Sequence, residues 1–413
     1  YGSAKAIQAA GPSVLLVYLL GGIVVYFMLR ALGEMAVSMP VVGSFSEYAR
    51  THLGGWAGFI TGWMYAFEMV IVCIADLTAV GIYMDFWYDG VPRWIWVALA
   101  LLIVGAVNLT SVRLFGELEF WFTLIKVAAV IAMIVGGAAI LIFGFGEQPH
   151  AVGVSNLWND GGFMPNGPQS VWLSLAVVMF SFGGIEMISI SAAEAKDPSR
   201  SVRSSAKAMM IRLATFYVLA VLIVVAVIPW RSASGLGDAV DASPFVLVFE
   251  QLGVHGVAHF VNFVVLIAAL SSANANLYAG ARLLHSLAAD GMAPRQLAQV
   301  NRAGVPARAV WLSTSGMVIA ILLALYSPKE AFLSMIFVIM VCALTVWVLI
   351  LFAYIVYKRV EPATDGFRLW GGQFTAALGV LLLFAVWVAL FMVRGSMVPA
   401  IVGVGYFVVL SLL

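Results

Sequence analysis

Two adjacent glycines and a carboxylate interrupt an apolar stretch at residues 171–195, which is long enough to cross a bilayer. The interrupting sequence is Phe180-Ser181-Phe182-Gly183-Gly184-Ile185-Glu186. Each glycine weakens a helix by about 1 kcal/mol relative to alanine, and a carboxylate at mid-membrane costs at least about 2.5 to 3.5 kcal/mol. Irregular backbone at this depth is tolerated where it lines a polar cavity, as in secondary transporters. The sequence therefore predicts a broken helix with a binding site at the break.

The residues of this break have separate expected roles. Backbone groups from Ser181 to Ile185 are expected to contact a small zwitterion, because helix ends offer dipoles that replace its lost water. Phe180 and Phe182 would form apolar walls or a gate, and Glu186 would stabilise the break or join a proton path. The alternative is a glycine at a close helix contact and a Glu186 paired with a neighbouring Lys or Arg.

Lys126 lies about two turns inside the apolar stretch at residues 120–143. Burial disfavours the charged form of a lysine, which would make Lys126 a natural proton carrier. The alternative is a permanently charged lysine that pairs with an acid or with freed carbonyl groups. A fixed charge there would take the place of a bound cation, so both alternatives favour proton over sodium coupling.

Two carboxylates, Glu68 and Asp76, lie within the apolar stretch at residues 56–86. Their spacing puts them on one side of a helix, about 12 Å apart along its axis. Carboxylates at this depth do not face lipid, so they predict a polar interior. One of them would line the substrate path while the other ties helices together, and the sequence does not assign these two roles.

A cluster of small polar residues, Ser271, Ser272 and Asn274, lies at mid-depth of the stretch at residues 256–289. Hydroxyl and amide groups at this depth either hydrogen-bond between helices or contact a substrate. Both roles stay open from the sequence.

Several acidic residues lie near the ends of the apolar stretches. We expect them either to form charge pairs that hold an inner gate closed or to be solvated helix ends. They are Glu34, Glu117, Glu119 and Glu194, the last with Lys196 nearby.

These residues must be positioned by membrane helices, because 63% of the chain is hydrophobic and 10% is charged, against about 25% charged residues in soluble domains. Twelve apolar windows are expected, at residues 1–10, 12–37, 56–86, 94–109, 120–143, 171–195, 206–228, 256–289, 309–325, 331–357, 374–393 and 398–413. The chain begins inside the first window, so we expect the start of that helix to precede Tyr1. The predicted fold class is an all-α polytopic membrane protein with twelve transmembrane helices.

Positive charges fall mainly on one set of alternate loops. Fifteen of the 21 Lys and Arg residues lie on that set, four lie on the other, and Lys5 and Lys126 lie within helices. Because positively charged loops stay in the cytoplasm, we expect both termini there.

Other classes of function find little support. The net charge of +1 argues against a nucleic-acid partner. Both cysteines lie in apolar runs, the histidines lack metal-ligand spacing, and there is no Walker loop or catalytic triad. We therefore expect no cofactor and no enzyme activity, and a proton gradient rather than ATP as the energy source.

Motifs along nearly the whole chain resemble the amino acid transporter family of the amino acid, polyamine and organocation superfamily. They are Gly11-Pro12, Arg30-Ala-Leu-Gly-Glu-Met35, Gly43-Ser-Phe45, Leu124-Ile-Lys126, Phe180-Ser-Phe-Gly-Gly-Ile-Glu186, Glu194-Ala-Lys-Asp-Pro198 and Ser271-Ser-Ala-Asn274. The resemblance implies a leucine-transporter-type inverted repeat of five plus five helices followed by two more. The expected units are residues 1–143, 168–357 and 373–413.

The resemblance also implies proton-driven uptake of an amino acid across a bacterial inner membrane. The substrate carboxylate would bind amides at a break in the first helix, of which only the tail, Gly2-Ser3, is present, and its ammonium would bind carbonyls freed in the sixth. Lys126 matches a proton-responsive lysine of related carriers, and Asp76 matches a common acidic residue. Glu68 is less typical of the family and is a candidate specificity residue.

Residues 117–121, with the sequence Glu-Leu-Glu-Phe-Trp, suggest a subgroup near proline and histidine permeases. The predicted function is a proton-coupled amino acid symporter of the plasma membrane that works by alternating access. Its expected partners are an amino acid, protons and the lipid bilayer; the sequence does not predict an oligomeric state. An antiporter of related metabolites and a sensor that binds without transport are the alternatives.

Overall fold

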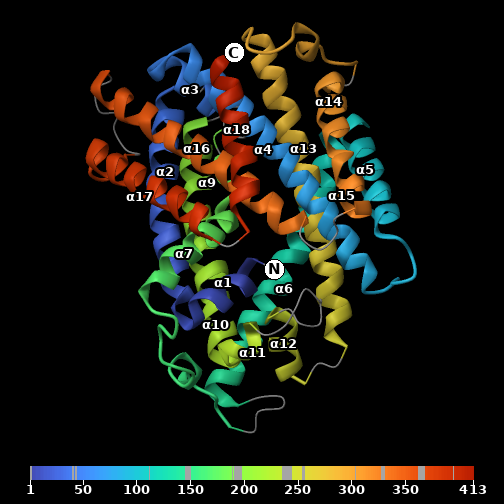
Figure 1. Ribbon diagram of the computed structural model, residues 1–413, viewed down its shortest axis with the longest axis vertical. Helices are drawn as coiled ribbons and strands as arrows, with labels where there is room; N and C mark the ends of the chain where they lie inside the picture. The colour runs from blue at the N-terminus through green and yellow to red at the C-terminus, as the bar shows by residue number, and fades with distance from the viewer. Residues whose placement is uncertain are drawn as a thin grey trace.

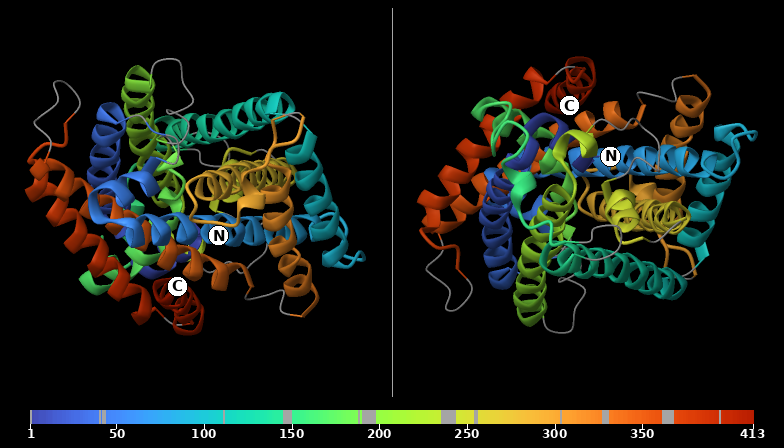
Figure 2. Two further views of the ribbon diagram at one scale, coloured as in Figure 1. Left: turned by 90° about the horizontal axis from the view of Figure 1, so that it is seen from above. Right: turned by 90° about the horizontal axis from the view of Figure 1, so that it is seen from below.

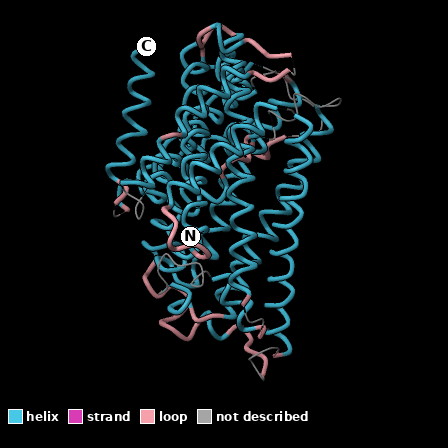
Figure 3. The backbone as a smooth tube through the Cα atoms, turned by 90° about the vertical axis from the view of Figure 1, so that its right-hand side faces the viewer, coloured by secondary structure: helices cyan, strands magenta, loops and turns pink. Residues whose placement is uncertain are grey.

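The computed structural model describes residues 2–39, 41, 44–110, 112–144, 150–187, 189, 198–234, 244–253, 256–302, 304–326, 331–360, 368–393 and 395–413. Within these ranges the chain forms helices and loops, without a β-strand (Figure 3). Many of the helices run along the long axis of the molecule (Figure 1). The described chain is therefore all-α, as the sequence predicts.

The α-helices are α1 (Gly2–Ala10), α2 (Val14–Ser38), α3 (Ser44–Leu53), α4 (Gly55–Asp85), α5 (Arg93–Thr110), α6 (Val112–Phe143), α7 (Pro168–Val178), α9 (Pro198–Arg212), α10 (Ala220–Val227), α11 (Trp230–Ser234), α12 (Pro244–Gln251), α13 (Val257–Ala289), α14 (Ala307–Met317), α15 (Ile319–Tyr326), α16 (Ala331–Val360), α17 (Gly372–Met392) and α18 (Met397–Leu412). A 3-10 turn, Met179–Phe182, continues α7, and a π-helix, Leu213–Leu219, joins α9 to α10.

Nine stretches of helix among the described residues are long and apolar enough to cross a membrane. One of them runs from Ser3 to Ser38 and contains both α1 and α2, and two further apolar helices, Pro168–Phe182 and Met397–Leu412, are shorter. These three segments account for the difference from the twelve apolar windows. The count of twelve and the division into residues 1–143, 168–357 and 373–413 stay predictions.

The chain turns sharply between α1 and α2. Gly11 has a φ of +62°, which favours glycine, and Pro12 follows it in a short 3-10 turn. Before the turn, α1 packs against α7 and α11; after it, α2 runs along the bundle (Figure 1). The start of the chain therefore lies beside the helix that carries the predicted break.

Helix α4 forms the centre of the bundle. It packs along α13 on one side and along α3 and α16 on others (Figures 1 and 2). Glu68 and Thr61 of α4 are buried. Because α4 is surrounded by other helices, its polar side chains meet protein groups rather than lipid.

We expect Gly58→Ala to destabilise the contact between α3 and α4 by about 1 to 3 kcal/mol. A Cβ atom at Gly58 would lie 2.6 Å from Arg50 Cβ and 3.0 Å from the backbone oxygen of Ser46. The measurement is the thermal unfolding midpoint of the detergent-purified protein. Gly405→Ala on α18 is the control, because its Cβ would meet nothing within 4 Å. An equal change in both variants would contradict the packing argument.

Candidate functional site

Helix α7 ends at Val178, within the apolar stretch that contains the paired glycines. After the 3-10 turn the backbone leaves helical geometry at Gly183, which has φ −58° and ψ 148°. Gly184 has φ +86°, a value that suits glycine. Gly183 is exposed and Gly184 is half-buried. The interruption expected from the sequence is therefore present, and its backbone is accessible.

Glu186 holds this turn from inside the protein. Its Oε1 accepts a hydrogen bond from the backbone N–H of Gly184 at 3.2 Å, and its Oε2 accepts one from the indole N–H of Trp347 on α16 at 3.1 Å. The side chain is 1% exposed. Its described partners are these N–H groups and the Tyr65 hydroxyl, not the Lys or Arg of the alternative, and Trp347 fastens the turn to α16.

Glu68 on α4 lies near the same turn. It is 1% exposed, and its carboxyl group lies close enough to Glu186 for the two groups to interact electrostatically. Tyr65, one turn earlier on α4, also approaches Glu186. Glu68 Oε2 has no hydrogen-bond partner. Because unpartnered buried polar atoms are costly, this place suits a bound cationic group or a proton.

Aromatic rings cover another side of the interruption. The Phe182 ring lies 6.2 Å from that of Tyr18 on α2 and 5.5 Å from that of Tyr217 in the π-helix, between centroids. The hydroxyl groups of Tyr18 and Ser181 are 3.5 Å apart. A Cβ atom on Gly21 of α2 would lie 2.7 Å from the Phe182 ring, so a glycine there permits the close contact. Phe182 is a buried wall, while Phe180 is half-buried.

A second polar cluster joins α4, α6 and α13. Lys126 Nζ on α6 donates a hydrogen bond to Ser271 Oγ on α13 at 2.9 Å. Asp76 on α4 interacts through hydrogen bonds with the side chains of Ser272 and Asn276 and electrostatically with Lys126. The structure therefore brings together Lys126, Asp76 and the serines that the sequence places on three separate helices.

Helix α5 extends this second cluster through Asn108. Its Nδ2 donates hydrogen bonds to Asn274 Oδ1 at 2.8 Å and to the Val104 backbone oxygen at 3.0 Å. The Nδ2 group of Asn274 is buried without a partner. This amide is therefore held in one orientation with its donor group unused.

The two clusters are connected by α4, which carries Glu68 toward the interruption and Asp76 toward Lys126. Their eight-residue spacing corresponds to about 12 Å along the helix. Among the described residues, no group of three or more His, Cys, Asp or Glu side chains is arranged to hold a metal ion. The carboxyl, amide, hydroxyl and ammonium groups of the two clusters provide charge pairing, hydrogen bonding and proton exchange.

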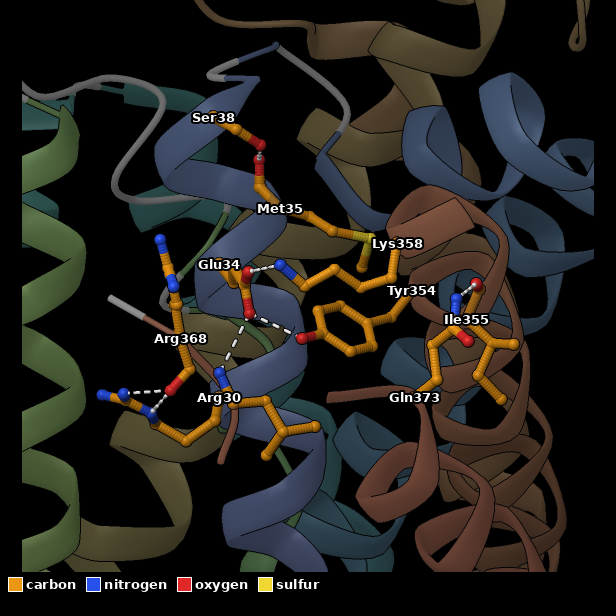
Figure 4. Close-up of polar contacts among 10 residues, drawn as sticks. Arg30, Glu34, Met35, Ser38, Tyr354, Ile355, Lys358, Arg368 and Gln373 are labelled. Atoms are coloured by element: carbon orange, nitrogen blue, oxygen red, sulfur yellow. Dashed lines mark hydrogen bonds and ion pairs between the residues drawn. The ribbon is translucent and has the colours of Figure 1, made fainter. Parts of the chain in front are cut away.

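Glu34 forms a third buried cluster at one end of α2 (Figure 4). It is fully buried and forms an ion pair with Lys358 near the end of α16. Its Oε2 accepts hydrogen bonds from the Tyr354 hydroxyl at 2.6 Å and from the backbone N–H of Leu369 at 2.9 Å. One turn earlier, Arg30 donates from Nε to the backbone oxygen of Arg368 at 3.1 Å. Glu34 thus joins α2, α16 and the segment before α17.

Comparison with known proteins places this arrangement in a family. A family model described as amino acid permease matches residues 1–412. The chain belongs to the amino acid permease family. Membership makes it a multi-pass membrane transporter of amino acids rather than an enzyme.

Several bacterial relatives support the assignment. An amino acid permease of Bacillus subtilis strain 168, YtnA, whose name calls it uncharacterized, is 44% identical over 87% of this chain and 76% of its own length. The aromatic amino acid transport protein AroP of Escherichia coli K12 is 41% identical over 87% of this chain and 77% of its own length. AroP of Salmonella typhimurium SL1344 is 39% identical over 98% of this chain and 90% of its own length. The subgroup suggested by residues 117–121 stays a prediction.

The remaining residues predicted from the sequence are spread over the permease. Gly2 begins α1 and Ser3 is half-buried on it, and α1 packs against α7. Glu117 is exposed on α6. The side-chain surroundings of Glu119, and Glu194 with Lys196, lie outside the described residues. Of the acidic residues near helix ends, Glu34 is the one with a described buried charge pair.

Sequence reasoning missed several partners of the permease's polar residues. They are Trp347, Tyr65, Asn108, Tyr354 and Lys358. Trp and Tyr inside an apolar helix carry one polar atom each, which usually needs a partner when buried. That rule would have singled out Trp347 and Tyr65 as candidates, but not their contact with Glu186.

We expect Glu34→Gln to lower the stability of the permease by up to about 3 kcal/mol, because it leaves the partly buried Lys358 ammonium without its counter-charge. The measurement is the thermal unfolding midpoint in detergent. Glu47→Gln is the control, because Glu47 pairs with Arg50 at 2.7 Å in a more exposed ion pair, which contributes about 0 to 1 kcal/mol. Similar midpoints for both variants would contradict a stabilising role for the Glu34 pair.

Proposed function

We propose that this permease imports an amino acid together with protons by alternating access. The observation that carries the proposal is the interruption of α7 at Met179–Glu186, with accessible glycine backbone and the buried carboxylate of Glu186. Such backbone at membrane depth suits a water-filled or ligand-filled cavity, not lipid. Amino acid import itself follows from the family.

The substrate is proposed to bind at this interruption. Its ammonium group would meet backbone carbonyls of Ser181 to Ile185 and the negative charge of Glu68, whose Oε2 has no partner. Its carboxylate would meet backbone amides near Gly2 and Ser3, because α1 packs beside α7. Helix ends favour charged groups of opposite sign in this way.

An aromatic amino acid is the first substrate class to test. The AroP relatives are named for aromatic amino acid transport. The rings of Phe182 and Tyr18 beside the interruption supply surfaces for ring contacts, which contribute about 0.5 to 1.5 kcal/mol beyond burial. Glu68 would then distinguish substrates through their ammonium group or a second polar group.

The proton path is proposed to use the second cluster. Lys126 is positioned by its hydrogen bond to Ser271, and its charge is balanced by nearby Asp76. Loss of a proton from Lys126 would remove that balance and change the attraction between α6 and α4. Glu186 is the second candidate, because its protonation would weaken its hold on Gly184 and Trp347.

The proposed setting is a bacterial inner membrane, with both termini in the cytoplasm. The distribution of Lys and Arg supports this orientation. It puts the ends of α2 and α16 that meet at Glu34 and Lys358 on the cytoplasmic side.

The decisive experiment is uptake into proteoliposomes with an imposed proton gradient. Each of the twenty amino acids is tested as a competitor of labelled phenylalanine. Accumulation that collapses with the gradient supports proton symport. Counterflow that survives the collapse, without net accumulation, would indicate an antiporter, and binding without uptake would indicate a sensor.

We expect Gly184→Val to reduce substrate affinity by at least about tenfold. Its φ of +86° is a strained conformation for a β-branched residue, so the turn would have to rearrange. Substrate binding to purified protein is the measurement. Gly304→Val is the control, because Gly304 has φ +74° in the loop before α14 and shares the strain but is not part of the proposed site. Unchanged affinity for Gly184→Val would show that the substrate binds elsewhere.

We expect Lys126→Ala to abolish proton-driven accumulation while some exchange remains. Lys126→Arg separates the two roles left open by the sequence, since arginine keeps its charge at all physiological pH values. A proton carrier loses accumulation in both variants, whereas a fixed charge keeps it in Lys126→Arg. Full pH-dependent accumulation by Lys126→Ala would contradict any role in coupling.

A further inference from the structure

A cavity of about 220 Å³ lies between α2, the end of the 3-10 turn and the α9–π-helix segment. Its walls include Tyr18, Gly22 and Tyr26 from α2, Phe182, and Met210 and Val218 from the α9–π-helix segment. Gly22 has no side chain to fill the space, and a Cβ atom there would meet nothing within 4 Å. The cavity is therefore apolar and has room for a ligand.

The cavity opens on the membrane-facing side of α2. Leu19 and Ile23, which also border it, are 47% and 48% exposed, and neighbouring Leu20 is 44% exposed. All three lie within the apolar stretch Ser3–Ser38 that is long enough to cross the bilayer. Molecules that reach such an opening are those of the bilayer itself, so a lipid acyl chain matches both its chemistry and its depth.

Positive charges continue from the cavity along one face of α9. Arg203 and Lys207 lie seven and three residues before Met210, which forms part of the cavity wall. This spacing places all three residues on the same side of α9. Arg203 and Lys207 are both exposed. Basic residues beside a gap between membrane helices attract anionic lipid headgroups.

We propose that this groove binds an anionic phospholipid, with an acyl chain in the cavity and the phosphate group on Lys207 and Arg203. The lipid cavity and the proposed amino acid site share the rings of Tyr18 and Phe182, which line the cavity and lie beside the interruption. The two meet at Phe182, whose ring forms a wall of the cavity and directly precedes Gly183. A bound acyl chain would press this ring against Tyr18 and Gly21 and hold the interruption of α7 in its present shape.

Native mass spectrometry tests the proposal with phosphatidylglycerol and phosphatidylcholine carrying identical acyl chains. The wild-type protein should bind phosphatidylglycerol more tightly than phosphatidylcholine. Gly22→Leu should fill the cavity and weaken phosphatidylglycerol binding by at least about tenfold. Gly405→Leu is its matched control, because a Cβ atom on Gly405 of the apolar helix α18 would likewise meet nothing within 4 Å.

The double variant Arg203→Gln, Lys207→Gln tests the headgroup without changing the cavity. The affinity of this variant for phosphatidylglycerol should fall at least about fivefold and so equal its affinity for phosphatidylcholine. Its affinity for phosphatidylcholine should be the same as that of the wild-type protein. Equal wild-type affinities for the two lipids would overturn the proposal, as would Gly22→Leu binding with wild-type affinity. A Gly22→Leu variant that loses a dimer while keeping its lipid would instead assign the groove to a second copy of the chain and also overturn it.

Discussion

Backbone groups in the hydrocarbon core of a membrane must be hydrogen-bonded, and this constraint governs the centre of the permease. Where α7 stops at Val178, the chain cannot rely on a regular helix to satisfy them. Glu186 accepts a hydrogen bond from one of these groups, the backbone N–H of Gly184, and a second one from the indole N–H of Trp347. A short irregular segment therefore requires specific partners on distant helices, and those partners determine which helices surround it.

Helix α4 shows how the same constraint spreads through the bundle. It carries two acidic residues, and each is brought against a different polar group: Glu68 near Glu186, and Asp76 near Ser272 and Lys126. A single rigid helix thus spans both clusters. A change of charge in one cluster can reach the other by a small displacement of α4, without any continuous chain of hydrogen bonds.

The sequence predicted the all-helical class and the interruption at Gly183-Gly184, because glycine pairs and buried carboxylates carry large local costs. It also predicted Lys126, Asp76 and Ser271 as polar residues of the interior, but not that they meet, since periodicity within one helix carries no information on its neighbours. The hydrogen bond between Glu186 and Trp347 joins residues 161 positions apart in the sequence. It could not be predicted from the sequence for the same reason. Glu34 was left between two roles because a charge near a helix end is solvated or buried according to tertiary packing alone.

The buried pair of Glu34 and Lys358 constrains how the molecule can change shape. Sliding α2 past α16 at this end would separate the fully buried carboxylate of Glu34 from the partly buried ammonium of Lys358, at several kcal/mol. Turning both helices together as one rigid body would leave the pair intact. Gln373 on α17 also donates to the Ile355 backbone oxygen of α16 at 3.2 Å (Figure 4). A motion that keeps both contacts would move α2, α16 and α17 together as one rigid body, and sliding would then take place where these helices meet the rest of the bundle.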